Sequence, residues 1–236
     1  MAEVMGKLRI VSRSGRQFAD RTEAGRLLAD ELRELRGQNP VVLGIPRGGV
    51  VVARELARAL EGEMDIVISR KLLSPGHPEL AMGSVSENGR VFLNETVLLD
   101  LGVDVQDVER EKERQLNEIR RRSEIFRRVY PRVPLEGRVV IVTDDGVATG
   151  ATAMVALWAV RQEHPARLVA AMPVGSEDSV VQLAREADET VCLRVPPQFY
   201  AVGQFYSRFE QLEDEDVLQI LSEEGEKKET LKSKRE

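Results

Sequence analysis

Five short runs in this chain are apolar almost throughout, and helical segments lie between most of them. The runs are 41–45, 65–68, 139–143, 168–172 and 190–193. A strand with one exposed face alternates apolar and polar residues, whereas these runs do not alternate, which indicates strands buried on both faces. We therefore expect a doubly wound α/β fold, in which a mainly parallel sheet is flanked by helices and ligands bind beyond the carboxyl ends of the strands.

The helical segments have recognisable ends. Asp20 and Glu23 have the spacing of a capping box, and Gly37 with Pro40 ends the helix that follows them. Further helices are expected at 49–60, at 151–162, and at 177–187 behind a Ser176 cap.

Two segments interrupt the alternation. Residues 84–93 have Asn88-Gly89 at their centre, the commonest turn pair of a two-residue hairpin. Residues 104–128 form a highly charged pattern that predicts a solvated cover helix, with phosphate binding by Arg120–Arg122 as the alternative. We expect one domain over residues 1–221 and a charged, disordered tail over 222–236.

Charge and composition disfavour several classes of partner. The net charge of −6 does not favour nucleic acid or an anionic membrane surface. No apolar run approaches the roughly 20 residues that a membrane span needs. The single cysteine, Cys192, excludes an intramolecular disulfide, and residues 1–16 lack the apolar core of a secretion signal. We therefore expect a cytoplasmic protein.

The segment 139–152 carries the clearest chemical pattern. A buried strand delivers Asp144 and Asp145 to its carboxyl end, and a loop of small residues then leads into a helix. Backbone N–H groups and the dipole at a helix start favour an anion, and the missing side chain of Gly150 lets a phosphate approach closely. The two carboxylates would repel phosphate, so we expect them to bind ribose hydroxyls or to act through magnesium. The alternative is an ordinary strand-to-helix turn.

The strand, the acid pair and the Thr-Gly-x-Thr loop, in that order, resemble the phosphoribosyl-pyrophosphate-binding signature of type I phosphoribosyltransferases. The resemblance implies that Asp144 and Asp145 hold the ribose. It assigns the 5′-phosphate to the loop residues Gly146, Val147, Ala148, Thr149, Gly150, Ala151 and Thr152. Many members carry a third acid where this chain has Ala148, but adenine phosphoribosyltransferases also have alanine there. Activity is therefore compatible with Ala148, although a carboxylate base at that position is absent.

Two further segments resemble pyrophosphate-binding parts of the family. Residues 44–50 look like its pyrophosphate loop, with Arg47, Gly48 and Gly49 as ligands. Arg70 and Lys71, which we expect at the end of the next strand, fit as pyrophosphate ligands and as candidate catalytic residues, followed by a mobile loop over 73–79. The alternatives are a glycine turn with a surface arginine, and two bases that merely end a strand.

Residues 196–210 are the candidate for the hood that recognises the acceptor in this family, helped by the N-terminal residues through Asp20. Its aromatic residues Phe199, Tyr200, Phe205 and Tyr206 could stack on a planar heterocycle, or could form a small core under a long loop. The resemblance covers about residues 18–221. It is closest to stand-alone phosphoribosyltransferases of bacteria and archaea for which no acceptor is established.

The resemblance implies a magnesium-dependent enzyme that transfers the phosphoribosyl group to a nitrogenous acceptor and releases pyrophosphate. Magnesium would be held by the substrate, with no direct protein ligand and with Asp144 and Asp145 acting through ribose hydroxyls or water. Homodimers are common in the family. The alternative is a non-catalytic protein that binds phosphoribosyl pyrophosphate or a nucleotide and regulates a partner. A dinucleotide-binding oxidoreductase is disfavoured because no Gly-x-Gly-x-x-Gly follows the first strand.

Overall fold

The computed structural model describes residues 6–233, except for the side chains of 77–80, 96 and 228–233. Six strands form one sheet in the order β1-β9-β8-β7-β2-β3, and every neighbouring pair is parallel. The strands are β1 (Lys7–Ser12), β2 (Val41–Gly44), β3 (Glu63–Ile66), β7 (Val139–Thr143), β8 (Arg167–Val174) and β9 (Glu189–Arg194). The expected parallel sheet is confirmed, and the half-exposed edge strand β1 is an addition to it.

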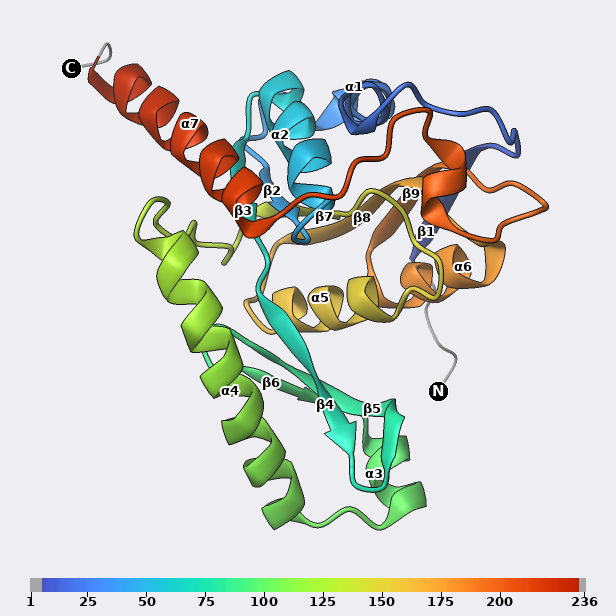
Figure 1. Ribbon diagram of the computed structural model, residues 1–236, viewed down its shortest axis with the longest axis vertical. Coiled ribbons are helices and arrows are strands. Elements are labelled where there is room, and N and C mark those ends of the chain that lie inside the picture. The colour runs from blue at the N-terminus through green and yellow to red at the C-terminus, as the bar shows by residue number, and fades with distance from the viewer. Residues whose placement is uncertain (1–5, 234–236) are drawn as a thin grey trace.

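Helices cover both faces of this sheet (Figure 1). On one face lie α1 (Arg21–Glu31) and α2 (Gly49–Leu60), and on the other lie α5 (Ala151–Arg161) and α6 (Glu177–Glu186). The Asp20 carboxylate accepts from the Glu23 N–H at 3.0 Å and so caps α1, as its sequence predicts. The central strands β2, β7 and β8 are buried along almost their whole length, so the core lies between the sheet and its two helical layers.

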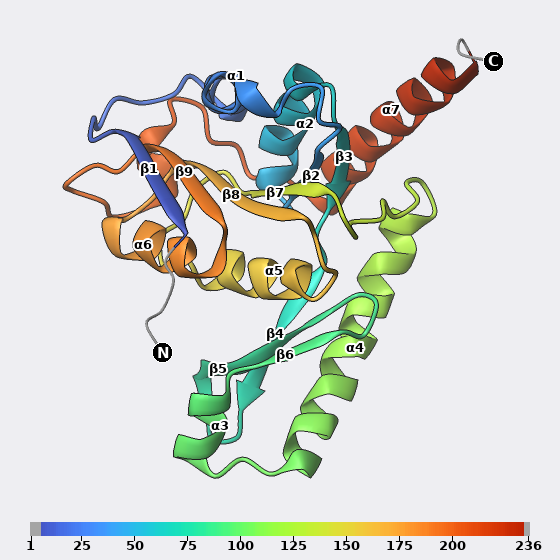
Figure 2. The same ribbon diagram turned by 180° about the vertical axis from the view of Figure 1, so that it is seen from behind.

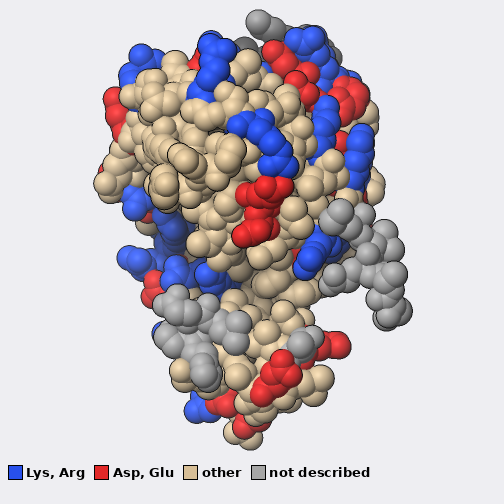
Figure 3. Space-filling view, turned by 90° about the vertical axis from the view of Figure 1, so that its right-hand side faces the viewer, with Lys and Arg blue, Asp and Glu red and all other residues tan. Residues whose placement is uncertain are grey.

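A second, antiparallel sheet lies beside α5 (Figures 1 and 2). It consists of β4 (Ser69–Ser74), β5 (His77–Ser86) and β6 (Val91–Leu93), followed by α3 (Glu95–Leu101) and α4 (Val105–Arg127). We call this part, residues 69–127, the lobe. The charged helix and the hairpin are confirmed, but the hairpin turn spans the three residues 87–89 rather than two, because the Ser86 N–H donates to Arg90 O at 3.0 Å. In Figure 3, basic side chains gather at one edge, where the lobe meets the main body.

The start of the lobe differs from the sequence expectation. The core strand β3 ends at Ile66, so Arg70 and Lys71 lie in β4 rather than at the end of a core strand. Residues 73–79 are not a long loop, because β4 and β5 are joined by a tight turn at Pro75-Gly76, where Gly76 has φ +72°. Proline and glycine mark a turn here, and two residues suffice to make it.

The C-terminal segment also differs from expectation. Residues from Ser222 to Ser233 continue the helix α7 (Asp214–Ser233) instead of forming a disordered tail. Val217 and Leu221 are fully buried, and Glu224 pairs with Arg58 of α2 at 2.5 Å. These contacts supply the stabilisation that the charged sequence by itself does not suggest. None of the helices within residues 6–233 combines the length and apolar character of a membrane span.

Candidate active site

The acid pair and the 44–50 loop lie side by side because β2 and β7 are hydrogen-bonded neighbours, with Gly44 opposite Thr143. The 44–50 loop approaches the acid pair so closely that it needs glycine at two positions, Gly48 and Gly49. A Cβ built on Gly48 would lie 1.9 Å from Asp145 Oδ2, and one built on Gly49 would lie 2.8 Å from the Asp144 Cα. The peptide bond between Pro46 and Arg47 is cis. Two motifs separated by about ninety residues therefore meet at the carboxyl edge of the sheet, where ligands bind in such folds.

The two carboxylates differ in their surroundings. Asp144 Oδ1 accepts from the Asp145 N–H at 2.8 Å, and burial together with the Asp145 charge raises the pKa of Asp144 well above its usual range. Burial also raises the pKa of Asp145, but an ion pair with Arg21 opposes that rise. The Tyr206 hydroxyl donates to the Asp145 carbonyl oxygen at 2.5 Å. The pair thus places two carboxyl groups beside a single cationic partner, Arg21, among the described residues.

The loop after the acid pair ends at the start of α5. Gly150, with φ +73°, is the N-cap residue, and no side chain caps the helix there. Thr149 and Thr152 are exposed at this uncapped start. The hydroxyls of Ser176 and Ser179 donate to the Ala148 carbonyl at 2.8 and 2.7 Å. These two hydrogen bonds hold the backbone of the loop in place. An uncapped helix start with two exposed hydroxyls has the donors that a phosphate needs.

Gly146 and Val147 anchor this loop to the rest of the molecule. The Val147 side chain is buried, its N–H donates to Val174 O at 2.9 Å, and its carbonyl accepts from Ser176 N–H at 3.0 Å. A Cβ on Gly146 would lie 2.7 Å from Val202 Cγ1. Of the seven predicted loop residues, Ala148, Thr149 and Thr152 are exposed and Gly150 is buried, so the predicted anion cradle is confined to residues 148–152.

Arg47 reaches the beginning of α7. Its guanidinium donates to Leu212 O at 2.6 Å, forms an ion pair with Glu213, and lies 3.6 Å from the Asp214 carboxylate. Asp214 also accepts from Arg122 of α4 at 2.9 Å. The predicted pyrophosphate ligand is thus held by carboxylates of the C-terminal segment in this structure.

Arg70 and Lys71 are not placed as the sequence predicts. Arg70 Nε donates to the Gln115 side chain of α4 at 2.7 Å. Lys71 is the next residue of β4, and successive side chains of a strand point to opposite faces. The two bases therefore point to opposite faces of β4, and their assignment as pyrophosphate ligands stays a prediction.

The hood residues divide into buried and exposed groups. Phe205 and Tyr206 are 1 % and 3 % exposed, and the Tyr206 ring packs 5.4 Å from that of Phe18. Phe199 stacks on Phe205 at 5.2 Å, whereas Tyr200 is 81 % exposed. This burial favours the interpretation of Phe205 and Tyr206 as a small core, which the N-terminal segment joins through hydrogen bonds of Phe18.

Sequence reasoning missed Arg21, the side chain that pairs with Asp145. Its Nε lies 2.8 Å from Asp145 Oδ2, and both side chains are largely buried. The one sequence signal was a basic residue at the first position of a helix, where the helix dipole disfavours positive charge.

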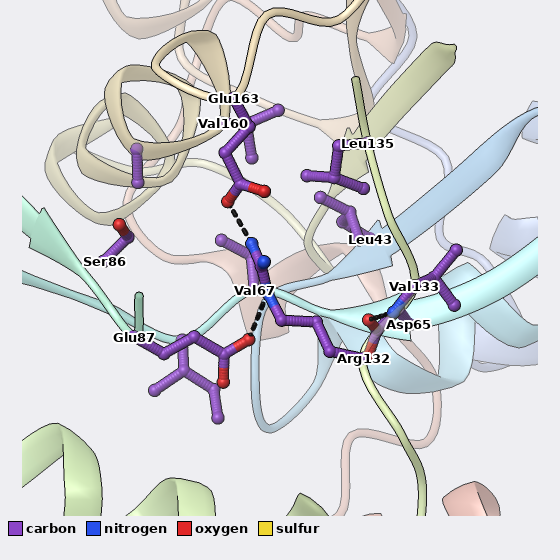
Figure 4. Close-up of a pocket in the computed structure, with 12 residues that line it drawn as sticks. Leu43, Asp65, Val67, Ser86, Glu87, Arg132, Val133, Leu135, Val160 and Glu163 are labelled. Atoms are coloured by element: carbon purple, nitrogen blue, oxygen red, sulfur yellow. Dashed lines mark hydrogen bonds and ion pairs between the residues drawn. The ribbon is translucent and has the colours of Figure 1, made fainter. Parts of the chain in front are cut away.

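A small enclosed cavity lies elsewhere, between the main body and the lobe (Figure 4). Its volume of about 10 Å³ has room for roughly one water molecule. Arg132 bridges Glu87 and Glu163 across it, as Figure 4 shows. These charges satisfy one another, so we interpret the cavity as part of a structural junction.

Comparisons with known proteins agree with this geometry. A family model described as the phosphoribosyl transferase domain matches residues 17–208. A protein of Mycobacterium tuberculosis H37Rv, provisionally named a phosphoribosyl transferase, is 45% identical over 204 residues, which cover 86% of this chain and 46% of that protein. The chain thus spans about half the length of this curated relative. The crystal structure of TT1426 from Thermus thermophilus is 49% identical with a TM-score of 0.83, covering 88% of this chain and 98% of that one.

Proposed function

The chain belongs to the family of proteins with a phosphoribosyl transferase domain, and from this premise we propose that it is a phosphoribosyltransferase. It would transfer the 5-phosphoribosyl group from phosphoribosyl pyrophosphate to a nitrogenous, nucleobase-like acceptor and release pyrophosphate. The observation that carries the proposal is the contact of Gly48 and Gly49 with the acid pair, directly before the uncapped start of α5. Three subsites for one ligand therefore lie on adjoining loops.

Each subsite suits one part of that ligand. Asp144 and Asp145 accept hydrogen bonds from the ribose hydroxyls, and residues 148–152 donate to the 5′-phosphate. Arg47 and the backbone around Gly48 and Gly49 bind the pyrophosphate. Departure of pyrophosphate leaves positive charge on the ribose ring, so the protein accelerates the reaction by positioning and charge stabilisation.

Magnesium fits this site as a substrate-bound ion. The described residues contain no cluster of three or more His, Cys, Asp or Glu side chains that could hold a metal. The acid pair nevertheless sets two carboxyl groups side by side, and burial together with the Asp145 charge raises the pKa of Asp144, so that ionisation of both groups is costly without a nearby cation. Magnesium prefers phosphate, water and carboxylate oxygens, and would screen the charge of the acid pair when the substrate brings the ion.

We also propose that the protein is cytoplasmic and that it forms homodimers, which are common in the family.

Isothermal calorimetry with phosphoribosyl pyrophosphate and magnesium chloride tests the proposal. We expect saturable binding that inorganic pyrophosphate competes away. An absence of detectable binding at millimolar ligand would overturn it.

Ala148 favours a second candidate function, because the exposed loop after the acid pair has alanine where a third carboxylate could act in catalysis. The protein could then bind phosphoribosyl pyrophosphate and regulate a partner without catalysis. Incubation with this ligand and a panel of nucleobases separates the two functions. Pyrophosphate release with any base supports the enzyme and removes the regulatory alternative.

A further inference from the structure

Arg21 occupies a place that is unfavourable for its charge. It is the first residue of α1, behind the N-cap Asp20, and is only 9 % exposed. The positive end of a helix dipole disfavours a cation, and burial of a guanidinium costs free energy unless its donors are satisfied. An arginine in this position therefore requires compensating contacts.

Three segments supply those contacts. Arg21 Nε donates to Asp145 Oδ2 at 2.8 Å, and Nη1 donates to the Glu210 carbonyl at 2.9 Å. The Phe209 ring lies under the guanidinium, with its centre 4.0 Å from the central carbon. A Cβ on Gly48 would lie 3.0 Å from Arg21 Nε, so the pyrophosphate loop also borders it. The guanidinium is held in one orientation at the junction of the ribose and pyrophosphate subsites.

The charges around Asp145 make this contact functional as well as structural. Asp144 lies beside it on the same loop, Arg21 faces it from α1, and the Tyr206 hydroxyl binds its carbonyl oxygen from the hood. Burial raises the pKa of Asp145 and favours the neutral acid, whereas the Arg21 charge and hydrogen bond oppose that rise and favour the carboxylate. A carboxylate can accept a hydrogen bond at either oxygen, while a protonated acid loses part of that capacity.

We propose that Arg21 is a positioning residue of this site, which orients the Asp145 side chain and holds it as an anion to accept a ribose hydroxyl. The inference rests on the proposed function, but its electrostatic part can be tested without any ligand.

Titration of the aspartate carboxyl carbons by NMR gives that ligand-free test. We expect Arg21→Gln to raise the titration midpoint of the acid pair by about one pH unit, the lower end of the effect of a close opposite charge. Arg21→Lys, which keeps the charge, should stay within about half a pH unit of the wild type. The control Arg208→Gln removes a neighbouring exposed arginine that pairs with Asp20 and should leave the midpoint unchanged. An unchanged midpoint in Arg21→Gln would overturn the inference.

Binding of phosphoribosyl pyrophosphate at several pH values gives the second test. Arg21→Gln should bind it about tenfold more weakly at one pH unit below its NMR midpoint, with much of the loss recovered at one unit above that midpoint, where the carboxylate ionises without help. Inorganic pyrophosphate should bind within about twofold of the wild type. An equal loss at every pH, with a lower melting temperature, would indicate a purely structural role.

The two proposals fail in distinguishable ways. A wild-type protein that does not bind phosphoribosyl pyrophosphate contradicts the proposed function, whatever the titration shows. A wild-type protein that binds it, with Arg21→Gln unchanged in affinity and pH dependence, contradicts only the role of Arg21. If Arg21→Gln does not fold, Arg21→Lys decides, because a loss of affinity above about tenfold despite the retained charge would contradict the electrostatic role.

Discussion

Asp145 is paired with Arg21, whereas no ion pair among the described residues involves Asp144. Because burial and Asp145 raise the pKa of Asp144, the native state binds this proton more tightly than the unfolded chain. The free energy of unfolding must then fall as the pH rises from the ordinary aspartate pKa through the raised value. Asp144, which we assign to the ribose subsite, thus lowers stability at neutral pH.

Asp144→Asn should therefore stabilise the fold at pH 7, by about 1.4 kcal/mol for each tenfold difference in proton affinity between the two states. The amide oxygen can still accept from the Asp145 N–H, so the loop keeps its hydrogen bond. The gain should disappear near pH 3, about one unit below the ordinary aspartate pKa, where Asp144 is largely protonated in both states. Urea denaturation at the two pH values measures it, and an equal gain at both would contradict the explanation.

Asp145→Asn should separate the ribose subsite from the phosphate cradle. A hydrogen bond from a neutral donor to a carboxylate contributes roughly 1.5–3 kcal/mol, so phosphoribosyl pyrophosphate should bind about ten- to a hundredfold more weakly. Inorganic phosphate lacks ribose and should bind as before or slightly better. Calorimetry with both ligands measures this, and equal losses for the two, with intact circular dichroism, would show that the acid is assigned wrongly.

Gly150→Val provides the contrasting variant. Gly150 has φ +73°, which a β-branched residue adopts only with strain, and a Cβ there would lie 3.3 Å from Ser179 Cβ. Both phosphate and phosphoribosyl pyrophosphate should bind at least about tenfold more weakly, because the cradle itself is distorted. Calorimetry with each ligand measures the change, and retention of phosphate binding would place the anion elsewhere.

At this scale the sequence predicts residues whose role is encoded locally. Asp144, Asp145 and Gly150 lie in one continuous strand–loop–helix pattern, so their relative positions follow from the order of the residues. Arg21 pairs with Asp145 across 124 positions, and nothing in its local sequence identifies that partner. The same limit applies to Arg70, because its contact with Gln115 depends on how α4 packs.

Among the elements, the beginning of α7 lies against the pyrophosphate loop. Glu213 and Asp214 contact the Arg47 guanidinium, the group that we assign to an anionic ligand. The double variant Glu213→Gln with Asp214→Asn should therefore bind inorganic pyrophosphate several-fold more tightly, since fewer charges compete for Arg47. Glu224→Gln, which alters an ion pair with Arg58 farther along the same helix, is the matched control. Competition calorimetry measures both, and weaker binding in the double variant would mean that the carboxylates support the site.

The elements differ in how well periodicity predicts them. Core strands such as β7 are apolar on both faces, so their own sequence predicts that they are buried. By contrast, β1 is a half-exposed edge strand, and α7 is charged along most of its length. Such elements are stabilised by distant partners: β1 pairs with β9, and α7 forms ion pairs with α2. Local composition therefore does not predict that β1 and α7 form stable elements.

For the whole molecule, the decisive contact is the junction between the main body and the lobe. Arg127, at the end of α4, pairs with Asp65 of β3 at 2.5 Å and with Glu87 beside the lobe hairpin at 2.6 Å. Asp65 is 1 % exposed and also accepts from the Val133 N–H at 2.8 Å. Burial raises the pKa of Asp65 while the Arg127 charge opposes the rise, so the Asp65 carboxylate depends on this guanidinium, whereas Glu87 also pairs with Arg132.

Loss of Arg127 should consequently destabilise the protein and loosen the lobe first. Arg127→Gln leaves the buried Asp65 carboxylate without its cation, while Glu87 keeps Arg132, and breaking a buried pair in this way costs about 3–5 kcal/mol. Arg128→Gln is the matched control, because its side chain is exposed and one position away. Urea denaturation measures the free energy of unfolding, and hydrogen exchange should rise in β4–β6 and α4 before it rises in the six-stranded sheet. Similar stability of the two variants, or uniform exchange throughout the chain, would mean that apolar packing against α5 holds the lobe instead.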